Sequence, residues 1–378
     1  MDNKRYRLGI IFNINPKWTG GLIYILNIIK TLNFLEDKDK PTLVVLYNSS
    51  LAKYIKEINY PYLEILPHKF SSIYKGYIDS FLKNKNTFVH DLVVNHRLDA
   101  IFPMHDYPVK SKLDAKLVSW YADLQHLHYP KFFTKIKRIE RNLRIKMILK
   151  NSKDLVVSSQ AVKDDFLKFF KVPEKLNIHI YHFVSIIDDL PTSTFDEIRL
   201  KYELPENFYI ISNQFHKHKN HKVVFEAIAE LKKMGIQVCI GITGRFPDKT
   251  DSTYLNELHD IINRNDLKSS IKFLGLIPRG DQLLLIKYSK AVIQPSLFEG
   301  WSTVIEDAKS LQVPVIASNL KVNVEQLSTM GTYFEPHNVD QLVAILKNYP
   351  IRVYNKQLYD SYESRMKNAA YELLHVFK

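Results

Sequence analysis

Segment 294–308, Gln-Pro-Ser-Leu-Phe-Glu-Gly-Trp-Ser-Thr-Val-Ile-Glu-Asp-Ala, contains the residue types of a ligand-binding corner. Apolar residues 291–293 predict the end of a strand before it, and Gly300 permits a tight turn. The pattern Thr303-x-x-Glu306 predicts a capping box that opens a helix. Because the first amides of a helix have no intrahelical partner, this helix start favours a phosphate group.

Three acids surround the predicted helix start. Glu299 stands just before the turn, and Glu306 and Asp307 lie in the first turn of the helix. Carboxylates accept hydrogen bonds from hydroxyl groups, so acceptors for sugar hydroxyls flank donors for phosphate. This combination predicts a site for a nucleotide sugar.

The same segment resembles the signature of retaining glycosyltransferases of family GT4. The resemblance rests on two acids with seven residues between them, an aromatic residue after Glu299-Gly300, and a Val-Pro-Val-Ile-Ala-Ser strand at 313–318. An ungapped count from Glu299 places Asp307 in the family's second acidic position and leaves Glu306 to the capping box. A gap of one residue would place Glu306 there instead.

The resemblance implies a GT-B fold and a set of donor contacts. It implies that helix amides near Ser302 and Thr303, together with Lys219, hold the diphosphate of the donor. It also implies that the second acid binds the ribose and that Glu299 contacts the transferred sugar. The family requires no metal or other cofactor, and retention there implies same-face attack in which the leaving phosphate takes the acceptor's proton.

Residues 210–221 place cations and amides between a predicted strand and a predicted helix. GT4 members usually carry an Arg in this loop and, five residues later, a Lys, and both neutralise the diphosphate. Lys219 matches the Lys, but the uncharged Gln214 stands where the Arg would be. Either Lys219 and the helix amides suffice, or Lys217 or Arg279 supplies the missing charge.

Residues 275–280, Gly-Leu-Ile-Pro-Arg-Gly, resemble the GT4 loop whose backbone contacts the nucleobase. Arg279 in this loop could stack on the base or reach a phosphate. It could equally be an exposed loop residue, and the sequence leaves these roles open.

Gly20 and Gly21 join the first predicted strand to the first predicted helix. Glycines at such a junction let the backbone approach a ligand closely. Their position is similar to that of the GT4 glycine loop, which faces the donor phosphates and the acceptor.

A loop after another predicted strand resembles the His-Asp loop of the family, which lies at the sugar end of the site. Asp123 is retained, but Ala122 stands at the usual His position. Gln125 or His126 would then have to supply hydrogen bonds to the sugar or the acceptor, and His126 fits a structural role equally well. The pair His105-Asp106 is a weaker candidate for the same role.

Strands and helices alternate along both halves of the chain, which predicts parallel α/β sheets. The predicted strands are 8–13, 42–47, 100–103, 116–120, 154–158, 178–181, 208–213, 237–243, 271–274, 291–293 and 313–318. The predicted helices are 21–32, 50–58, 131–153, 161–170, 221–234, 254–263 and 280–289, with a further helix opening at Thr303.

This pattern predicts an α/β fold with two doubly wound, Rossmann-like domains. Residues 1–184 form the acceptor-side domain, 185–200 a linker, and 201–355 the nucleotide-sugar-binding domain. By resemblance to GT-B proteins, a helix at 356–378 crosses back to the first domain. Ligands of such sheets bind beyond the carboxyl ends of the strands, so we expect the donor in a cleft between the domains.

Composition agrees with two globular domains. The chain has 378 residues, of which 46% are hydrophobic and 25% charged. A single cysteine, Cys239, excludes an internal disulfide. The net charge of +13 favours an anionic partner such as a nucleotide sugar, an anionic membrane or nucleic acid. We do not expect nucleic acid, because no recognition motif is present.

The basic residues are densest at 131–153, where Glu140 is the only acid. Apolar residues recur there at three- and four-residue spacing, which predicts an amphipathic helix; they are Phe132, Ile136, Ile139, Leu143 and Met147. The basic face is either solvated or rests on anionic lipid.

The sequence therefore predicts a retaining glycosyltransferase that moves a sugar from a nucleotide-diphosphate sugar to a hydroxyl of a glycan acceptor. We expect this acceptor to be lipid-linked, in the synthesis of bacterial surface polysaccharide or glycoconjugate. An epimerase or phosphorylase of the same fold is the alternative. No stretch reaches the length of a membrane span, so we expect a cytoplasmic protein that is peripheral on the inner face of the membrane.

Overall fold

The computed structural model describes residues 5–15, 19–56, 58–104, 109, 111–187, 190–246, 253–350, 352, 354 and 356–378. The chain forms two compact units. Unit 1 consists of Met1–Val184 and Glu363–Lys378, and unit 2 of Ser185–Tyr362.

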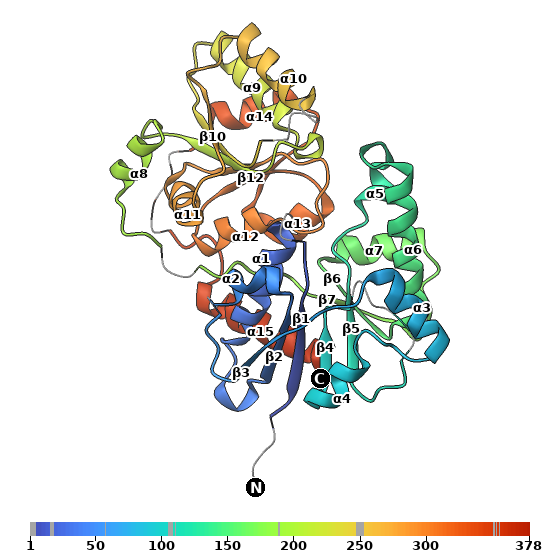
Figure 1. Cartoon of the computed structure of the whole chain (residues 1–378). Coiled ribbons are helices and arrows are strands. Elements are labelled where there is room, and N and C mark those ends of the chain that lie inside the picture. The colour runs from blue at the N-terminus through green and yellow to red at the C-terminus, as the bar shows by residue number, and fades with distance from the viewer. Residues whose placement is uncertain are drawn as a thin grey trace. The chain divides into compact units, whose positions relative to one another are not determined.

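Unit 1 contains a seven-stranded parallel sheet in the order β3-β2-β1-β4-β5-β6-β7 (Figure 1). The strands are β1 (Arg7–Phe12), β2 (Thr42–Tyr47), β3 (Leu63–Pro67), β4 (Ala100–Phe102), β5 (Lys116–Trp120), β6 (Asp154–Val157) and β7 (Asn177–Ile180). The helices are α1 (Thr19–Leu32), α2 (Ala52–Ile55), α3 (Ile73–Lys83), α4 (His90–His96), α5 (Gln125–His128), α6 (Lys135–Asn151), α7 (Gln160–Phe169) and α15 (Tyr362–Phe377).

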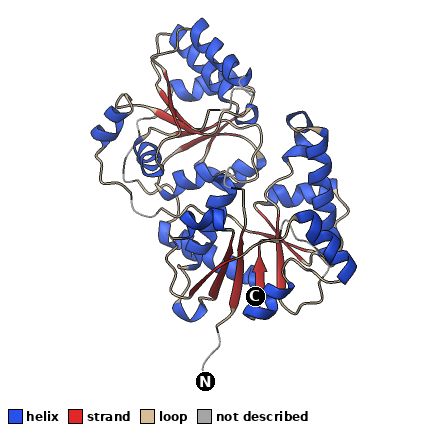
Figure 2. Cartoon of the chain, viewed as in Figure 1, coloured by secondary structure: helices blue, strands red, loops and turns tan. Residues whose placement is uncertain are grey.

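Helices cover both faces of this sheet (Figure 2). The sequence requires this cover, because consecutive residues of β1, from Leu8 to Phe12, are apolar or glycine and buried on both faces. The strand order reverses direction between β1 and β4. Ligands of doubly wound sheets bind at such a reversal, beyond the carboxyl ends of the strands.

Helix α15 packs on unit 1, although it follows unit 2 in the sequence. Tyr6 donates a hydrogen bond to the carbonyl oxygen of Phe377 at 2.5 Å. The rings of Phe377 and Phe102 lie 5.5 Å apart, and Tyr371 bonds to Asp39 at 3.1 Å. The last helix thus completes the core of the unit that the first strand begins.

Unit 2 contains a six-stranded parallel sheet in the order β10-β9-β8-β11-β12-β13. The strands are β8 (Tyr209–Ser212), β9 (Ile240–Thr243), β10 (Ile271–Gly275), β11 (Val292–Gln294), β12 (Val315–Ser318) and β13 (Thr332–Phe334). The helices are α8 (Phe195–Lys201), α9 (His221–Lys233), α10 (Thr253–Arg264), α11 (Arg279–Tyr288), α12 (Thr303–Ser310), α13 (Lys321–Leu327) and α14 (Val339–Lys347). Its strand order reverses between β8 and β11.

The prediction of two doubly wound α/β domains is confirmed, and most predicted elements are present. The helix predicted at 50–58 is shortened to α2, behind a 3-10 turn at Ser49–Leu51. The sequence did not predict β3, α3, α4 and α5 in unit 1, or α8, α13, β13 and α14 in unit 2. Strand β3 lies at the edge of its sheet and is only partly buried, so it lacks the continuous apolar run of the central strands.

Helix α6 is oriented differently from the prediction. Its apolar residues Ile136, Ile139 and Leu143 are exposed, with 77%, 67% and 60% of their surface accessible. Arg138 and Arg141 are half-buried instead. The amphipathic pattern predicted that the basic face of α6 is exposed and its apolar face buried. In the first half of α6 the apolar residues are exposed instead, and two of the arginines are half-buried.

The packing of the second half of α6 explains this orientation. Ile145, Ile148 and Leu149 are buried in a core cluster with Leu155 and Phe166. These residues lie on a different helical face from Ile136, Ile139 and Leu143, since side chains three or four positions apart share a face. Because one rigid helix presents one face to its core, burying the second half exposes the apolar residues of the first.

Candidate functional site

Polar side chains gather at the carboxyl ends of β8 and β11, where the strand order of unit 2 reverses. Asn213, which follows β8, donates a hydrogen bond to Gln294 of β11 at 2.9 Å, and both residues are buried. Gln294 in turn donates to Glu299 at 2.8 Å. The strand ends thus fix the position of the carboxylate that the resemblance assigned to the transferred sugar.

Glu299 also forms an ion pair with Lys219, with 2.6 Å between the carboxylate oxygen and Nζ. Both side chains are largely buried. The structure therefore joins two sequence-predicted residues that lie on different loops. The acid assigned to the sugar and the cation assigned to the diphosphate form an ion pair with each other.

The loop that carries Lys219 is held in place by Asn220. This residue has a left-handed backbone with a φ of 52°, and its side chain donates to the carbonyl oxygens of Pro295 and Pro336 at 3.1 and 2.7 Å. The loop before α9 is therefore tied to the segment that follows β11. Gln214, at the other end of the loop, is exposed and bonds to His216 at 2.9 Å.

The positive charge of this loop comes from its lysines. Burial, reinforced by the charge of Lys219, lowers the pKa of His218 to about 3. The same two causes lower the pKa of His221 to about 3. Both rings are neutral near pH 7, so Lys217 and Lys219 supply the charge available to a phosphate.

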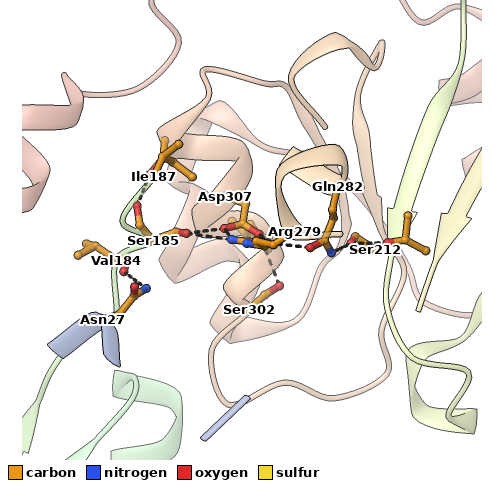
Figure 3. A network of polar contacts seen from close by, with 12 residues as sticks. Asn27, Val184, Ser185, Ile187, Ser212, Arg279, Gln282, Ser302 and Asp307 are labelled. Carbon is orange, nitrogen blue, oxygen red and sulfur yellow. Dashed lines mark hydrogen bonds and ion pairs between the residues drawn. The ribbon is translucent and has the colours of Figure 1, made fainter. Parts of the chain in front are cut away.

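A second set of polar residues surrounds Asp307 on α12 (Figure 3). Arg279, the first residue of α11, contacts both carboxylate oxygens of Asp307 at 2.7 and 2.5 Å. Ser185 donates a further hydrogen bond to Asp307. On its other side Arg279 donates to Gln282 at 3.0 Å, and Gln282 donates to Ser212 at the end of β8.

Asp307 is 2% exposed and Arg279 is partly exposed. Burial acts to lower the pKa of Arg279, but the charge and hydrogen bonds of Asp307 outweigh it and raise that pKa above its ordinary value. Asp307 therefore faces the loop that the resemblance assigned to the nucleobase. Arg279 contacts both oxygens of this carboxylate.

The two sets of residues meet at adjacent positions of one strand end. Ser212 belongs to the set of Asp307, and Asn213 belongs to the set of Glu299. In this way a chain of contacts connects both predicted acids through the carboxyl end of β8. This is the edge at which doubly wound sheets bind their ligands.

The capping box predicted at Thr303 and Glu306 is wrong. Ser302 is the N-cap of α12, and its side chain accepts from the amide of Ile305 at 3.3 Å. Glu306 is 1% exposed and accepts from Gln326 at 2.8 Å and Lys309 at 3.2 Å. The cap lies one residue earlier because a serine precedes the threonine, and either hydroxyl could have capped the helix.

This register leaves two helix amides directed out of the helix start. The amides of Thr303 and Val304 are the first two of α12 and have no intrahelical acceptor. The amide of Ser302 is already bonded to Gln326 at 3.2 Å, so its backbone does not offer the donor that the sequence predicted. Gly300, in the turn before the helix, is half-buried.

Gly244, which follows β9, shapes the same edge of the sheet. A Cβ atom at this position would lie 2.2 Å from the carbonyl oxygen of Asn213, and the φ of Gly244 is +151°. We expect Gly244→Ala to displace Asn213, to cost about 1–3 kcal/mol of stability and to weaken binding of nucleoside diphosphates. Thermal unfolding and calorimetric titration would measure the two effects.

Gly235→Ala is the matched control for this substitution. Gly235 also has a positive φ, +76°, but a Cβ atom there would meet nothing within 4 Å. Its replacement should lower stability through backbone strain alone and leave nucleotide affinity unchanged. Unchanged nucleotide affinity in Gly244→Ala would show that the position of Asn213 does not matter to the site.

In unit 1, Gly20 and Gly21 form the first turn of α1. Gly20 is exposed and Gly21 is buried. They lie after β1, at the reversal of the strand order of this unit. The pair His105-Asp106 lies outside the described residues.

Asp123 and His126 occupy different environments in unit 1. Asp123 accepts a hydrogen bond from the amide of Gln125 at 3.0 Å and lies 3.7 Å from Arg141. His126 is 1% exposed, bonds to Asn142 at 2.9 Å, and burial lowers its pKa. This burial favours the structural role that the sequence left open for His126, whereas Asp123 is partly accessible.

Several residues of the site were not predicted from the sequence. Gln282 lies three residues after Arg279, so helical spacing could have identified it. Gly244 directly follows a predicted strand, which is also a usable signal. Ser185 and Gln326 carry no local signal, because they reach the site only through the fold.

Within the described ranges, no helix is both long enough and apolar enough to cross a membrane. Among the same residues, His, Cys, Asp and Glu side chains do not come together in groups of three or more that could hold a metal ion.

Residues 194–371 match the family described as Glycosyl transferases group 1. The O-antigen chain mannosyltransferase RfbU of Salmonella typhimurium is 25% identical over 228 residues, which cover 60% of this chain and 58% of RfbU. O-antigen chain mannosyltransferase B of Escherichia coli is 30% identical over 87 residues, or 23% of each protein. The chain thus matches less than two thirds of the length of these relatives.

Solved structures match over almost the whole chain. A glycosyltransferase from Rickettsia africae ESF-5 is 16% identical, with a TM-score of 0.64, and the match covers 98% of this chain and 96% of that one. Anabaena Alr3699/HepE, in complex with UDP and glucose, is 17% identical, with a TM-score of 0.63 and coverage of 98% and 97%. These likenesses confirm the GT-B fold.

Proposed function

We propose that this chain, in which residues 194–371 form a Glycosyl transferases group 1 domain, is a retaining glycosyltransferase of the GT4 type. It transfers a sugar from a nucleotide-diphosphate sugar to a hydroxyl of a glycan acceptor. The observation that carries this proposal is the pair of neutralised acids, Glu299 with Lys219 and Asp307 with Arg279, connected through the end of β8. Both acids and Lys219 match the signature residues of GT4.

Donor binding exchanges the partners within each ion pair. Lys219 leaves Glu299 for the diphosphate, and Glu299 becomes free to accept hydrogen bonds from the sugar. Arg279 leaves Asp307, which then accepts from the ribose hydroxyls. The two cations balance the charge of the diphosphate, and Arg279 supplies the charge that Gln214 lacks.

The contacts proposed above and the family resemblance support the following reaction. The bond between the anomeric carbon and the leaving phosphate oxygen breaks, and the acceptor hydroxyl forms the new bond on the same face of the sugar. The acceptor's proton passes to the leaving phosphate. Lys219 and the amides of Thr303 and Val304 stabilise the charge that develops on that phosphate, without a metal or other cofactor.

The acceptor is a lipid-linked glycan of a bacterial surface polysaccharide or glycoconjugate. The similarity to two O-antigen chain mannosyltransferases supports this assignment. Asp123 acts at the acceptor or the transferred sugar, as the resemblance implies. An epimerase or phosphorylase of this fold would bind the same donor but would not consume a glycan acceptor.

A nucleotide screen tests the donor site. We expect one of UDP, GDP, dTDP, ADP and CMP to raise the melting temperature of the protein, because a ligand that binds only the native state stabilises it. Lys219→Ala should weaken binding of that nucleoside diphosphate about tenfold or more, with little effect on the nucleoside. Equal losses for both ligands would remove Lys219 from the diphosphate site, and no response to any nucleotide would contradict the proposed function.

We assign the protein to the inner face of the cytoplasmic membrane as a peripheral protein. The exposed residues Ile136, Ile139 and Leu143 lie beside Lys135 and Lys146 on α6. Apolar side chains next to lysines are the features that bind an interfacial helix to anionic lipid.

Vesicle binding tests this assignment. The protein should sediment with phosphatidylglycerol vesicles at low salt, and the double variant Ile136→Ser, Ile139→Ser should stay in the supernatant. Leu200→Ser is the control, because Leu200 is also exposed, at 64%, but lies on α8. Equal sedimentation of wild type and the double variant would contradict docking through α6.

A further inference from the structure

Polar atoms without partners are concentrated around α5 and the first half of α6. Tyr121 Oη, His126 Nδ1, Arg138 Nε and Arg141 Nη1 are buried and have no hydrogen-bond partner among the described residues. Tyr121 and His126 are 6% and 1% exposed. Leaving such a group buried and unpaired destabilises the folded chain, and the effect is larger for a charged group.

These side chains lie in one region of unit 1. Arg141 lies over the ring of Phe133 at 5.0 Å, and that ring packs edge-on against His126 with 6.2 Å between centroids. The charges of Arg138 and Arg141 both act on His126, and the charge of Arg141 acts on Tyr121. The four atoms therefore belong to one cluster of hydrogen-bonding groups.

The acidic side chains of this region do not form hydrogen bonds with the unpaired atoms of the cluster. Asp123 lies 3.7 Å from Nη2 of Arg141, beyond the 2.7–3.2 Å of an ordinary N–H···O bond. Glu140 pairs with Lys137 at 3.0 Å and lies 3.7 Å from Arg144. The chemistry that would satisfy two arginines and a tyrosine hydroxyl together is an anion with several acceptor oxygens, such as a phosphate.

We propose that Arg138 and Arg141 bind the phosphate or diphosphate that joins the acceptor glycan to its lipid. This inference rests on the proposed function, which makes the acceptor lipid-linked. Helix α6 has the two faces that such a molecule requires, with Ile136, Ile139 and Leu143 exposed on one and the arginines half-buried on the other. A helix with its side chains is about 10–12 Å wide, so a lipid chain at the apolar face can have its phosphate at the arginines.

The position of Asp123 agrees with this arrangement. Asp123 is the residue assigned to the acceptor or the sugar, and it lies beside Arg141. A phosphate at Arg138 and Arg141 would hold the glycan attached to it next to this carboxylate. Arg138 and Arg141 are thus positioning residues for the acceptor.

Calorimetric titration with farnesyl diphosphate, farnesol and inorganic diphosphate tests the proposal. The full-length protein would first be saturated with the nucleotide that occupies its donor site. We expect farnesyl diphosphate to bind and Arg138→Gln and Arg141→Gln each to weaken this binding about tenfold or more. Farnesol should bind too weakly to measure, and inorganic diphosphate should bind more weakly than farnesyl diphosphate.

The other outcomes overturn the proposal in different ways. Equal binding of farnesyl diphosphate by wild type and both arginine variants would remove the phosphate from this cluster. Farnesol binding as tight as that of farnesyl diphosphate would show an apolar site, and equally tight inorganic diphosphate would show a site for free phosphate compounds.

A stability measurement and a third variant show whether a loss of binding is caused by misfolding. Arg138→Gln removes a buried unpaired donor, so the unliganded variant should melt at or above the wild-type temperature, whereas a structural arginine would lower it. Tyr121→Phe keeps the ring and removes only the hydroxyl. This variant should fold normally and bind farnesyl diphosphate about threefold more weakly than the wild type. This loss of affinity is smaller than the loss typical of removing one hydrogen bond to a charged group. An affinity equal to that of the wild type would exclude Tyr121 from the site.

Failure of this site can be distinguished from failure of the proposed function. Lys219→Ala should leave farnesyl diphosphate binding unchanged, and the arginine variants should leave nucleotide binding unchanged. Binding that depends on Arg138 and Arg141 without turnover of any nucleotide sugar would keep the phosphate site and reject the transferase.

Discussion

Glu299→Gln should lower sugar transfer by roughly 10²–10³-fold, the effect typical of removing one preorganised electrostatic group from an active site. The carboxylate is held by Gln294 and Lys219, and the proposed exchange makes it available to the transferred sugar. Gln has the same shape but no charge. Steady-state kinetics with the donor identified in the nucleotide screen would measure the loss.

Nucleotide binding should survive in this variant. Lys219 no longer has to leave a carboxylate, so the affinity for the nucleoside diphosphate should stay constant or increase slightly. Glu230→Gln is the control, since Glu230 forms an exposed ion pair with Lys233 on α9, and it should leave both measurements unchanged. Turnover near that of the wild type in Glu299→Gln would remove this residue from catalysis.

Asp307→Asn should raise the Michaelis constant of the donor about tenfold to a hundredfold, because hydrogen bonds to a charged group contribute about 1.5–3 kcal/mol. The substitution also removes the ion pair with Arg279, which donor binding must otherwise break. The carboxylate of that pair is buried and its guanidinium is partly exposed. Because donor binding breaks this pair in the wild type as well, we expect the loss of the ribose contact to dominate.

Glu306→Gln is the matched comparison at the neighbouring position. Glu306 is buried between Lys309 and Gln326, and breaking a buried pair costs about 3–5 kcal/mol. The structure thus changes the expectation from the capping box, in which Gln could replace Glu. Glu306→Gln should lower the melting temperature and leave the donor Michaelis constant unchanged, and the reverse pattern would assign the ribose to Glu306.

The alternation of strands and helices predicted most of the fold, because apolar runs such as those of β1 and β2 are buried on both faces and remain apolar throughout. Edge elements are less visible in the sequence. Strand β3 lies at the edge of its sheet beside β2 and mixes exposed and half-buried residues, so it has no continuous apolar run. Helix α3 exposes Tyr74, Ile78 and Phe81, and its pattern therefore does not mark a buried face.

The sequence identified the acids of the candidate site but not their partners. Glu299 and Lys219 are 80 positions apart, and Asp307 and Arg279 are 28 apart, so neither pair has a local signature. The orientation of α6 was missed for a related reason. Its apolar spacing has two possible faces, and only the core formed with Leu155 and Phe166 selects between them.

The return of α15 to unit 1 has a consequence for biosynthesis. Met366, Ala370, Leu373 and Phe377 are fully buried there, so the core of unit 1 combines the first and last residues of the described chain. A ribosome releases the N-terminal residues first, and domains generally fold as units. Unit 2 is continuous in sequence and can fold as soon as it has left the ribosome. Unit 1 cannot complete its core until α15 has been synthesised, so part of its apolar surface stays exposed until then.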